Sequence, residues 1–227
     1  MNIKRQRTSL VIGMGIGQLY KKVLTELGHA VVTVDPDISK GADFPDIKSA
    51  IFARGLFDTA HICTPNWTHE RIAYDLAPYA GIVFIEKPGL KTKEDWIRLT
   101  YAFPQTRFMM VKNNMWRNYI KELQGYVEVS DRIVLNWINK DRIPSPGSWF
   151  TNKELAFGGV SRDLMPHLLS LFIALNPNYK KSSVANKSSN THWSLDELES
   201  TEYGTVNKGG TYDVDDECSI EYEERGK

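Results

Sequence analysis

The sequence predicts an α/β fold, in which a doubly wound parallel sheet is followed by a smaller, incomplete α+β domain. Two observations predict the sheet. Short apolar runs alternate with segments of helical apolar spacing as far as residue 117, and the first run leads directly into the glycine-rich turn Gly13–Gly17. The pattern then changes to one alternating segment, one long apolar helix and a polar end. We therefore expect domains over residues 1–117 and 118–227.

The first strand, Ser9–Ile12, is expected to open a nucleotide-binding motif. A helix follows the glycine turn until Gly28, which favours helix termination. A second strand, Ala30–Val34, then ends at Asp35. Strand, glycine turn, helix, strand and acidic residue in this order are the fingerprint of a dinucleotide-binding Rossmann fold. The candidates to hold the pyrophosphate are Gly13, Met14, Gly15, Ile16 and Gly17, and the predicted apolar stripe of the helix is Leu19, Val23, Leu24 and Leu27.

The glycine spacing departs from the usual pattern in one place. GxGxxG requires a glycine at the position of Gln18, and the third glycine comes one residue early. The first two glycines still permit a tight turn and close approach to a phosphate. The departure therefore puts the packing of helix on strand in doubt, and not the phosphate site. Taken alone, the motif could equally be a turn without a ligand.

Asp35 is expected to select the nucleotide. A carboxylate after the second strand accepts hydrogen bonds from the adenosine ribose hydroxyls. It repels a 2′-phosphate by on the order of 4 kcal/mol at about 4 Å and an effective dielectric constant of ~20. The sequence therefore favours NAD as cofactor over NADP. The alternative is an aspartate that only forms the turn before Pro36.

The stretch from 58 to 88 predicts one strand–helix–strand crossover. Two apolar runs, Ala60–Cys63 and Ile82–Ile85, flank a segment with apolar residues at helical spacing. Ligands bind beyond the carboxyl ends of strands in an open parallel sheet, so the polar residues after each run should line one crevice. They are Thr64, Pro65 and Asn66 after the first run, and Glu86, Lys87 and Pro88 after the second. The other elements expected here are a loop over Asp37–Pro45, helices over Asp46–Arg54 and Thr92–Phe103, and a strand over Arg107–Val111.

In the second domain, an apolar helix is expected over Val160–Leu175. Asp163 and His167 lie four residues apart and share one face of it. Pro166 lacks an amide hydrogen, so their turn should be irregular. Alternating apolar residues predict a strand over Arg132–Asn139. The remaining expected elements are a helix over Tyr119–Gly125, a loop over Asp141–Ser148, and strands over Ser200–Val206 and Glu217–Tyr222.

Three segments of the chain resemble one family of enzymes. The TPN-xx-H motif at 64–69, followed by a strand that ends in EKP at 86–88, is similar to the glucose–fructose oxidoreductase and inositol dehydrogenase (Gfo/Idh/MocA) family. A Gly-Gly pair followed by D-xxx-H, here Asp163 and His167, is similar as well. The resemblance implies a nicotinamide-dependent oxidoreductase that acts on sugars or polyols, a class that includes nucleotide sugars. It implies cofactor contacts from Thr64, Pro65, Asn66, His69, Glu86 and Lys87.

The resemblance also implies catalytic roles for Lys87, Asp163 and His167. An imidazole has a reference pKa near 6.5 and can take a hydroxyl proton near neutrality, while Lys87 would stabilise negative charge on the reacting oxygen. Pro88 is expected to follow a cis bond that aims Lys87. A buried histidine satisfied by Asp163 is the alternative for His167. The expected substrate-binding residues are Lys87, Asn114, Arg117, Asp163 and His167.

Composition and charge argue against several classes of partner. Lys and Arg number 28, as do Asp and Glu, so no overall field favours nucleic acid or a membrane surface. Residues from Asp196 onward are acidic, with 11 acidic and 3 basic side chains. No apolar run approaches membrane-spanning length, and no metal-ligand spacing of histidines and cysteines is evident. Two distant cysteines, Cys63 and Cys218, favour reduced thiols in the cytoplasm.

The resemblance leaves two alternatives to an enzyme, because the second domain of the family is only partly present. One is a protein that binds NAD as a sensor or regulator without turnover, and the other is a structural subunit that partners a longer homologue. An incomplete sheet exposes an edge, so we expect a homo-oligomer formed through the C-terminal sheet.

Overall fold

A computed structural model describes residues 5–128, 132–139, 142–176, 178–201 and 204–224. The chain divides into two compact units, Met1–Val111 and Lys112–Lys227. The division falls a few residues before the expected boundary at 117, so Asn114 and Arg117 belong to the second unit. The fold class is α/β as predicted, with a parallel sheet in the first unit and a small antiparallel sheet in the second.

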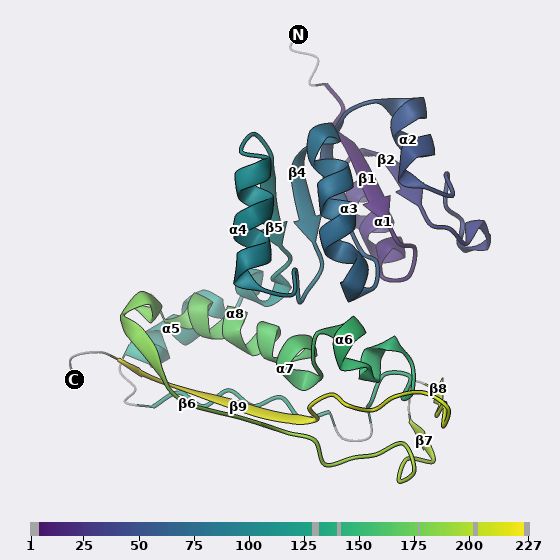
Figure 1. Cartoon of the computed structure of the whole chain (residues 1–227). Coiled ribbons are helices and arrows are strands. Elements are labelled where there is room, and N and C mark those ends of the chain that lie inside the picture. The colour runs from purple at the N-terminus through teal and green to yellow at the C-terminus, as the bar shows by residue number, and fades with distance from the viewer. Residues whose placement is uncertain (1–4, 129–131, 140–141, 177, 202–203, 225–227) are drawn as a thin grey trace. The chain divides into compact units, whose positions relative to one another are not determined.

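The first unit contains a five-stranded parallel sheet with the strand order β2-β1-β3-β4-β5 (Figure 1). Because every neighbouring pair is parallel, the carboxyl ends of all five strands meet at one edge. Ligand-binding turns are expected at that edge. The strands are β1 (Thr8–Ile12), β2 (Ala30–Val34), β3 (Phe57–Ile62), β4 (Ala80–Ile85) and β5 (Arg107–Met110).

Helices cover the two faces of this sheet unequally. Three helices, α2 (Ile47–Arg54), α3 (His69–Leu76) and α4 (Lys93–Ala102), pack on one face around the main apolar core. The N-terminus of α4 is capped by the predicted residue Thr92, which exchanges hydrogen bonds with Asp95. The core residues on this face include Leu10, Ile12, Val34, Ala60, Ile62, Leu76, Val83, Ile85 and Leu99. Three 3₁₀ turns, Ile38–Lys40, Asn66–Thr68 and Ala77–Tyr79, join these elements.

Helix α1 (Gly17–Glu26) packs on the opposite face. Its predicted apolar stripe is confirmed for Leu24, which is buried, and is wrong for the other three residues. Leu19, Val23 and Leu27 are 55%, 43% and 68% exposed. The face of α1 that packs on the sheet contains Leu24 together with Gly17 and Tyr20, and the three follow one another at helical spacing. A Cβ at Gly17 would lie 3.0 Å from Val11 Cγ1, so the early third glycine does serve the close packing of helix on strand.

A chain of polar side chains runs along the α1 face of the sheet. His29 Nδ1 lies 2.7 Å from Ser9 Oγ, Ser9 Oγ lies 2.8 Å from Thr59 Oγ1, and Thr59 Oγ1 lies 3.0 Å from His61 Nε2. The His61 ring stacks on Phe84 at a centroid distance of 4.9 Å. His61 is 7% exposed, and its Nδ1 has no hydrogen-bond partner among the described residues. Burial lowers the pKa of His61 to about 4.

The second unit is built around helix α8 (Met165–Leu175), which packs against α5 (Ile120–Glu128) and the 3₁₀ turn Asn113–Trp116. A two-stranded antiparallel sheet of β6 (Ser182–Asn190) and β9 (Glu217–Glu224) lies beside it, with the Phe172 ring stacked on Tyr222. The remaining elements are α6 (Lys153–Ala156), α7 (Val160–Asp163), β7 (Ser200–Thr201), β8 (Gly204–Thr205), and 3₁₀ turns at Trp149–Thr151 and Tyr179–Lys181.

Several predictions for the second unit are wrong. Residues 132–139 form no strand, and their apolar side chains are largely exposed. The expected helix over Val160–Leu175 divides into α7 and α8 at Leu164, two residues before Pro166. Strand β6 was not expected, because its sequence has no apolar alternation and nearly all of it is exposed. In place of the expected strand over Ser200–Val206, the described residues form two short strands, β7 and β8, and residues 202–203 between them lie outside the described residues.

The buried neutral His61 should make the first unit sensitive to acid. Its pKa is lower in the folded state than the unfolded value of about 6.5, so its stabilising contribution is full above pH 6.5 and is lost as the pH falls toward 4. The variant His61→Phe keeps an aromatic ring on Phe84 but cannot take up a proton. Between pH 7 and pH 4, the wild type should therefore lose roughly 2–3 kcal/mol more unfolding free energy than the variant. Urea unfolding at both pH values measures this, and equal losses in the two proteins would contradict it.

Candidate active site

The glycine turn joins the ends of three strands. Gly13 has φ +89°, a conformation that favours glycine, and its N–H donates to Val34 O at 2.8 Å. A Cβ at Gly13 would lie 2.8 Å from Cys63 O. A side chain is therefore excluded at Gly13, both by the backbone conformation and by the backbone that follows β3.

The next residues of the turn lead into the start of α1. A Cβ at Gly15 would meet no atom within 4 Å. Among the described residues we find no protein acceptor for the N–H groups of Gly15 and Ile16, and the first turn of α1 contains no acidic residue. Open space, available amides and a helix N-terminus are what an anionic diphosphate requires. These residues therefore fit a dinucleotide.

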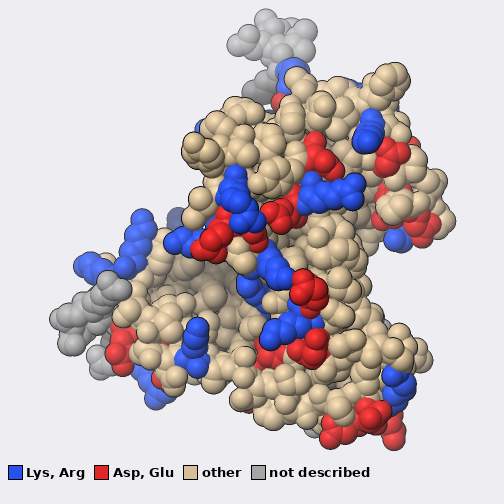
Figure 2. Space-filling model, in the orientation of Figure 1, with Lys and Arg blue, Asp and Glu red and all other residues tan. Residues whose placement is uncertain are grey.

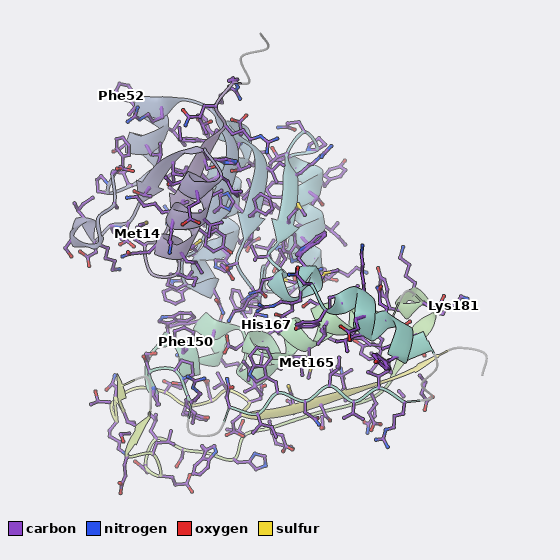
Figure 3. The ribbon with its side chains drawn as sticks, turned by 180° about the vertical axis from the view of Figure 1, so that it is seen from behind. Met14, Phe52, Phe150, Met165, His167 and Lys181 are labelled. Atoms are coloured by element: carbon purple, nitrogen blue, oxygen red, sulfur yellow. The ribbon has the colours of Figure 1, made fainter. Side chains whose placement is uncertain are left out.

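Asp35 fastens the end of β2 to the glycine turn. It is 4% exposed, and its Oδ2 accepts from the Met14 N–H at 2.7 Å while Oδ1 accepts from the Asp37 N–H at 2.9 Å. The Lys40 ammonium lies 3.4 Å from Oδ1. Burial alone would raise the pKa of Asp35, but the two amides and Lys40 outweigh it and lower the pKa. The side chain is therefore an anion at neutral pH. Met14, whose amide it binds, is labelled in Figure 3.

The turn after β3 contains Thr64, Pro65 and Asn66, as the sequence predicted, and Pro65 precedes the 3₁₀ turn Asn66–Thr68. His69 is fully buried. Its Nδ1 lies 2.9 Å from Gly89 O and its Nε2 lies 2.8 Å from Thr64 O. Burial lowers the pKa of His69, although the two carbonyl groups oppose this. His69 therefore holds two turns together from inside the protein.

The turn after β4 contains Glu86, Lys87 and Pro88, with a cis Lys87–Pro88 bond. The Glu86 N–H donates to Ile62 O at 3.0 Å, and Glu86 O accepts from Gly89 N–H at 2.9 Å. Glu86 Oε2 accepts from the Lys87 N–H at 3.0 Å. Lys87 is half-buried. The glycine turn and the turns after β2, β3 and β4 thus lie at one edge of the sheet.

In the second unit, Asp163 ends α7 and His167 lies in the first turn of α8 (Figure 3). The Asp163 N–H donates to Gly159 O at 2.8 Å, and the His167 N–H donates to Leu164 O at 3.0 Å. The ring of Trp137 stacks on His167 at 5.3 Å with an interplanar angle of 28°. The irregular turn predicted from Pro166 therefore separates two short helices, each with one candidate side chain.

Sequence reasoning missed Asp215, which organises the start of α7. Its carboxylate accepts hydrogen bonds from the Gly159 N–H at 3.0 Å, the Ser161 N–H at 2.6 Å and the Ser161 hydroxyl at 2.8 Å. Asp215 O accepts from the Val160 N–H at 2.9 Å. The signal that could have found it is the acidic segment Asp213–Glu217 before β9, but Ser161, which Asp215 binds, lies 54 residues earlier.

The two expected substrate residues outside these turns lie early in the second unit. Asn114 is in the 3₁₀ turn Asn113–Trp116, and Arg117 follows it. Arg117 Nε lies 3.5 Å from Asn114 Oδ1, and the 3₁₀ turn packs against α8, which contains His167. Asn114, Arg117, Asp163 and His167 therefore belong to neighbouring elements of one unit.

The distribution of charged residues and the lengths of the helices can be compared with what nucleic-acid, metal and membrane sites require. On the face shown in Figure 2, Lys and Arg side chains are interspersed with Asp and Glu. Within the described ranges, no group of three His, Cys, Asp or Glu side chains is placed to hold a metal ion. None of the helices in those ranges is both long enough and apolar enough to cross a membrane.

The first unit has the architecture of a dinucleotide-binding domain. No protein-family profile matches the chain. A curated relative, the putative UDP-kanosamine synthase oxidoreductase subunit of Amycolatopsis mediterranei (strain S699), is 30% identical over 187 residues, which cover 74% of this chain and 51% of the relative. The chain thus spans about half the length of the curated relative that it matches.

Solved structures of oxidoreductases share the fold. GenD2 from gentamicin A biosynthesis, in complex with NAD, has a TM-score of 0.72 at 19% identity over 99% of this chain and 64% of that chain. Levoglucosan dehydrogenase with NADH and levoglucosan has a TM-score of 0.70 at 20% identity, covering 97% and 64%. The WlbA dehydrogenase of Chromobacterium violaceum with NADH and UDP-GlcNAcA has a TM-score of 0.74 at 16% identity, covering 98% and 65%. All three are longer than this chain.

Gly159→Ala should destabilise the second unit. The added Cβ would lie 1.7 Å from Asp215 O, so the capping segment must move and its hydrogen bonds to α7 are lost. We expect a loss of roughly 2–4 kcal/mol in unfolding free energy, measured by urea or thermal unfolding. The matched control is Gly125→Ala in α5, where a Cβ meets no atom within 4 Å and alanine favours a helix. Equal stability of the two variants would contradict this role of Asp215.

Proposed function

We propose that the chain belongs to a nicotinamide-dependent oxidoreductase of the Gfo/Idh/MocA type that oxidises or reduces a hydroxyl-bearing carbon of a sugar. One observation supports the proposal most: the glycine turn, with Asp35 behind it, and the turns with Thr64 and Lys87 lie at one edge of the sheet. A different feature of the sequence predicts each of these turns. Their meeting at one edge is what a dinucleotide-binding site requires.

NAD is the proposed cofactor, and when bound it supplies the nicotinamide that accepts or donates hydride. The amides of Gly15 and Ile16 would hold its diphosphate, as argued from their open space and position before α1. Asp35 would accept from the ribose hydroxyls. The rest of the NAD molecule would be held by two further turns. One contains Thr64, Pro65 and Asn66, and the other contains Glu86 and Lys87. His69 contributes by fixing these two turns, because its ring is buried between them.

The side chains of this chain would handle the proton and the charge. Lys87 would donate a hydrogen bond to the reacting oxygen and stabilise negative charge that develops there. His167 would take the hydroxyl proton, with Asp163 to orient it. Asn114 and Arg117 would bind other hydroxyl or charged groups of the substrate. These roles rest on the resemblance of the EKP and D-xxx-H motifs.

A nucleotide sugar is the substrate class that we favour. The curated relative is named as part of a UDP-kanosamine synthase, and the WlbA structure contains UDP-GlcNAcA. The word subunit in the name of the relative also fits assembly with other chains. For this chain we propose a homo-oligomer formed through the β6–β9 sheet, because nearly all of strand β6 is exposed.

The protein should bind NADH about 10- to 100-fold more tightly than NADPH. The buried, ionised Asp35 would repel a 2′-phosphate, while Lys40 at 3.4 Å offsets part of this repulsion. Fluorescence titration with both nucleotides measures the preference. Gly15→Ala is the control, since its Cβ meets no protein atom but would enter the space proposed for the diphosphate; it should weaken both nucleotides and keep the preference. Equal affinities in the wild type would refute the role of Asp35.

Lys87→Met tests whether the EKP turn carries the chemistry. The variant keeps most of the stem and removes the charge, so NADH affinity should stay within a few-fold. Hydride transfer to bound NAD should slow by roughly 10²-fold, the scale for loss of one positioned donor, and His167→Asn should also slow it. Single-turnover absorbance with a panel of UDP-sugars is the measurement. Lys93→Met, at an exposed lysine of α4, is the control. NADH binding without transfer to any sugar would favour a sensor.

A further inference from the structure

Tyr20 connects helix α1 to the turn that contains Lys87. Its hydroxyl donates a hydrogen bond to Glu86 Oε1, across 66 residues of sequence. Tyr20 lies three residues after Gly17, in the first turn of the helix that begins at the glycine turn. The bond therefore joins the first nucleotide-binding element of the chain to the turn after β4.

The ring of Tyr20 is held in place independently of its hydroxyl. It packs against the His61 ring at a centroid distance of 5.5 Å and an angle of 54°, and His61 in turn stacks on Phe84 at 4.9 Å and 7°. These rings come from β3 and β4. A phenylalanine at position 20 would keep this packing. The packing therefore does not explain why position 20 has a hydroxyl group.

Both carboxylate oxygens of Glu86 are used within the protein. Oε1 accepts from the Tyr20 hydroxyl and Oε2 accepts from the Lys87 N–H at 3.0 Å. Burial and the negative charge of Glu86 both raise the pKa of Tyr20, so its hydroxyl keeps its proton and remains a donor. With one donor on each oxygen, the plane of the carboxylate is fixed. The Tyr20 hydroxyl therefore fixes the rotation of the Glu86 side chain that holds the Lys87 backbone.

We propose that Tyr20 is a positioning residue for Lys87, acting through the Glu86 carboxylate. The proposal rests on the function proposed above, in which Lys87 faces the reacting oxygen. Without the hydroxyl, Oε1 loses its donor, the carboxylate is free to rotate, and the bond to the Lys87 N–H weakens. A small misplacement of a catalytic group can cost up to about 10²-fold in rate. Cofactor affinity depends mainly on other turns and should change little.

Tyr20→Phe tests the proposal with two readouts. In the nucleotide-free protein, hydrogen exchange of the Lys87 amide, followed by NMR, should accelerate at least tenfold, while the Glu86 amide, which bonds to Ile62 O, should keep its protection. In single turnover, hydride transfer should slow roughly 10- to 100-fold with NADH affinity within about threefold. The control is Tyr74→Phe, whose ring packs on Phe103 in the opposite layer; it should match the wild type in both readouts.

A double-mutant cycle with Glu86→Gln shows whether Tyr20 acts through Glu86. If it does, adding Tyr20→Phe to Glu86→Gln changes the exchange rate of the Lys87 amide by less than about twofold, whereas independent effects multiply. Wild-type exchange of the Lys87 amide in Tyr20→Phe would overturn the proposal, as would weaker NADH binding at an unchanged transfer rate. If the wild type oxidises no sugar, the proposed function fails, and amide exchange in the cycle still decides whether Tyr20 positions Lys87.

Discussion

The first unit depends on a close contact between two backbone segments. At Gly13, the chain after β1 approaches the chain after β3 so closely that a single added carbon would lie 2.8 Å from Cys63 O. This contact aligns the glycine turn with the turn that contains Thr64. Parallel pairing of β3 with β4 then brings the Lys87 turn to the same edge. One position without a side chain therefore sets the spacing of the whole edge.

Side chains then fasten the turns to one another in pairs. Asp35 bonds to the Met14 amide, His69 lies between two carbonyl groups, and the Tyr20 hydroxyl reaches Glu86. Each of these groups is buried or half-buried, where hydrogen bonds are strong and an unpaired polar group is costly. The turns are therefore organised before any ligand binds, which lowers the ordering cost of binding.

The sequence predicted the elements of the first unit well, because each strand is an apolar run with its own turn signal. Strand β2 and the helix after Thr92 are examples. The sequence-based prediction failed where strand formation depends on a partner far away in the sequence. Residues 132–139 alternate between apolar and polar side chains but form no strand. Strand β6 forms without such alternation because β9 pairs with it. The candidate residues came from motifs. Tyr20 and Asp215 were missed because each acts on a group more than 50 residues away.

The protonation state of the His69 ring affects the two turns that it joins. Burial lowers its pKa, so at neutral pH the ring has one hydrogen. Two carbonyl oxygens, Thr64 O at 2.8 Å and Gly89 O at 2.9 Å, face its two nitrogens. The neutral ring can donate to only one of them at a time. The tautomer of a single buried imidazole thus determines which of the two turns is bound more firmly, and exchange between tautomers transfers that bond from one turn to the other.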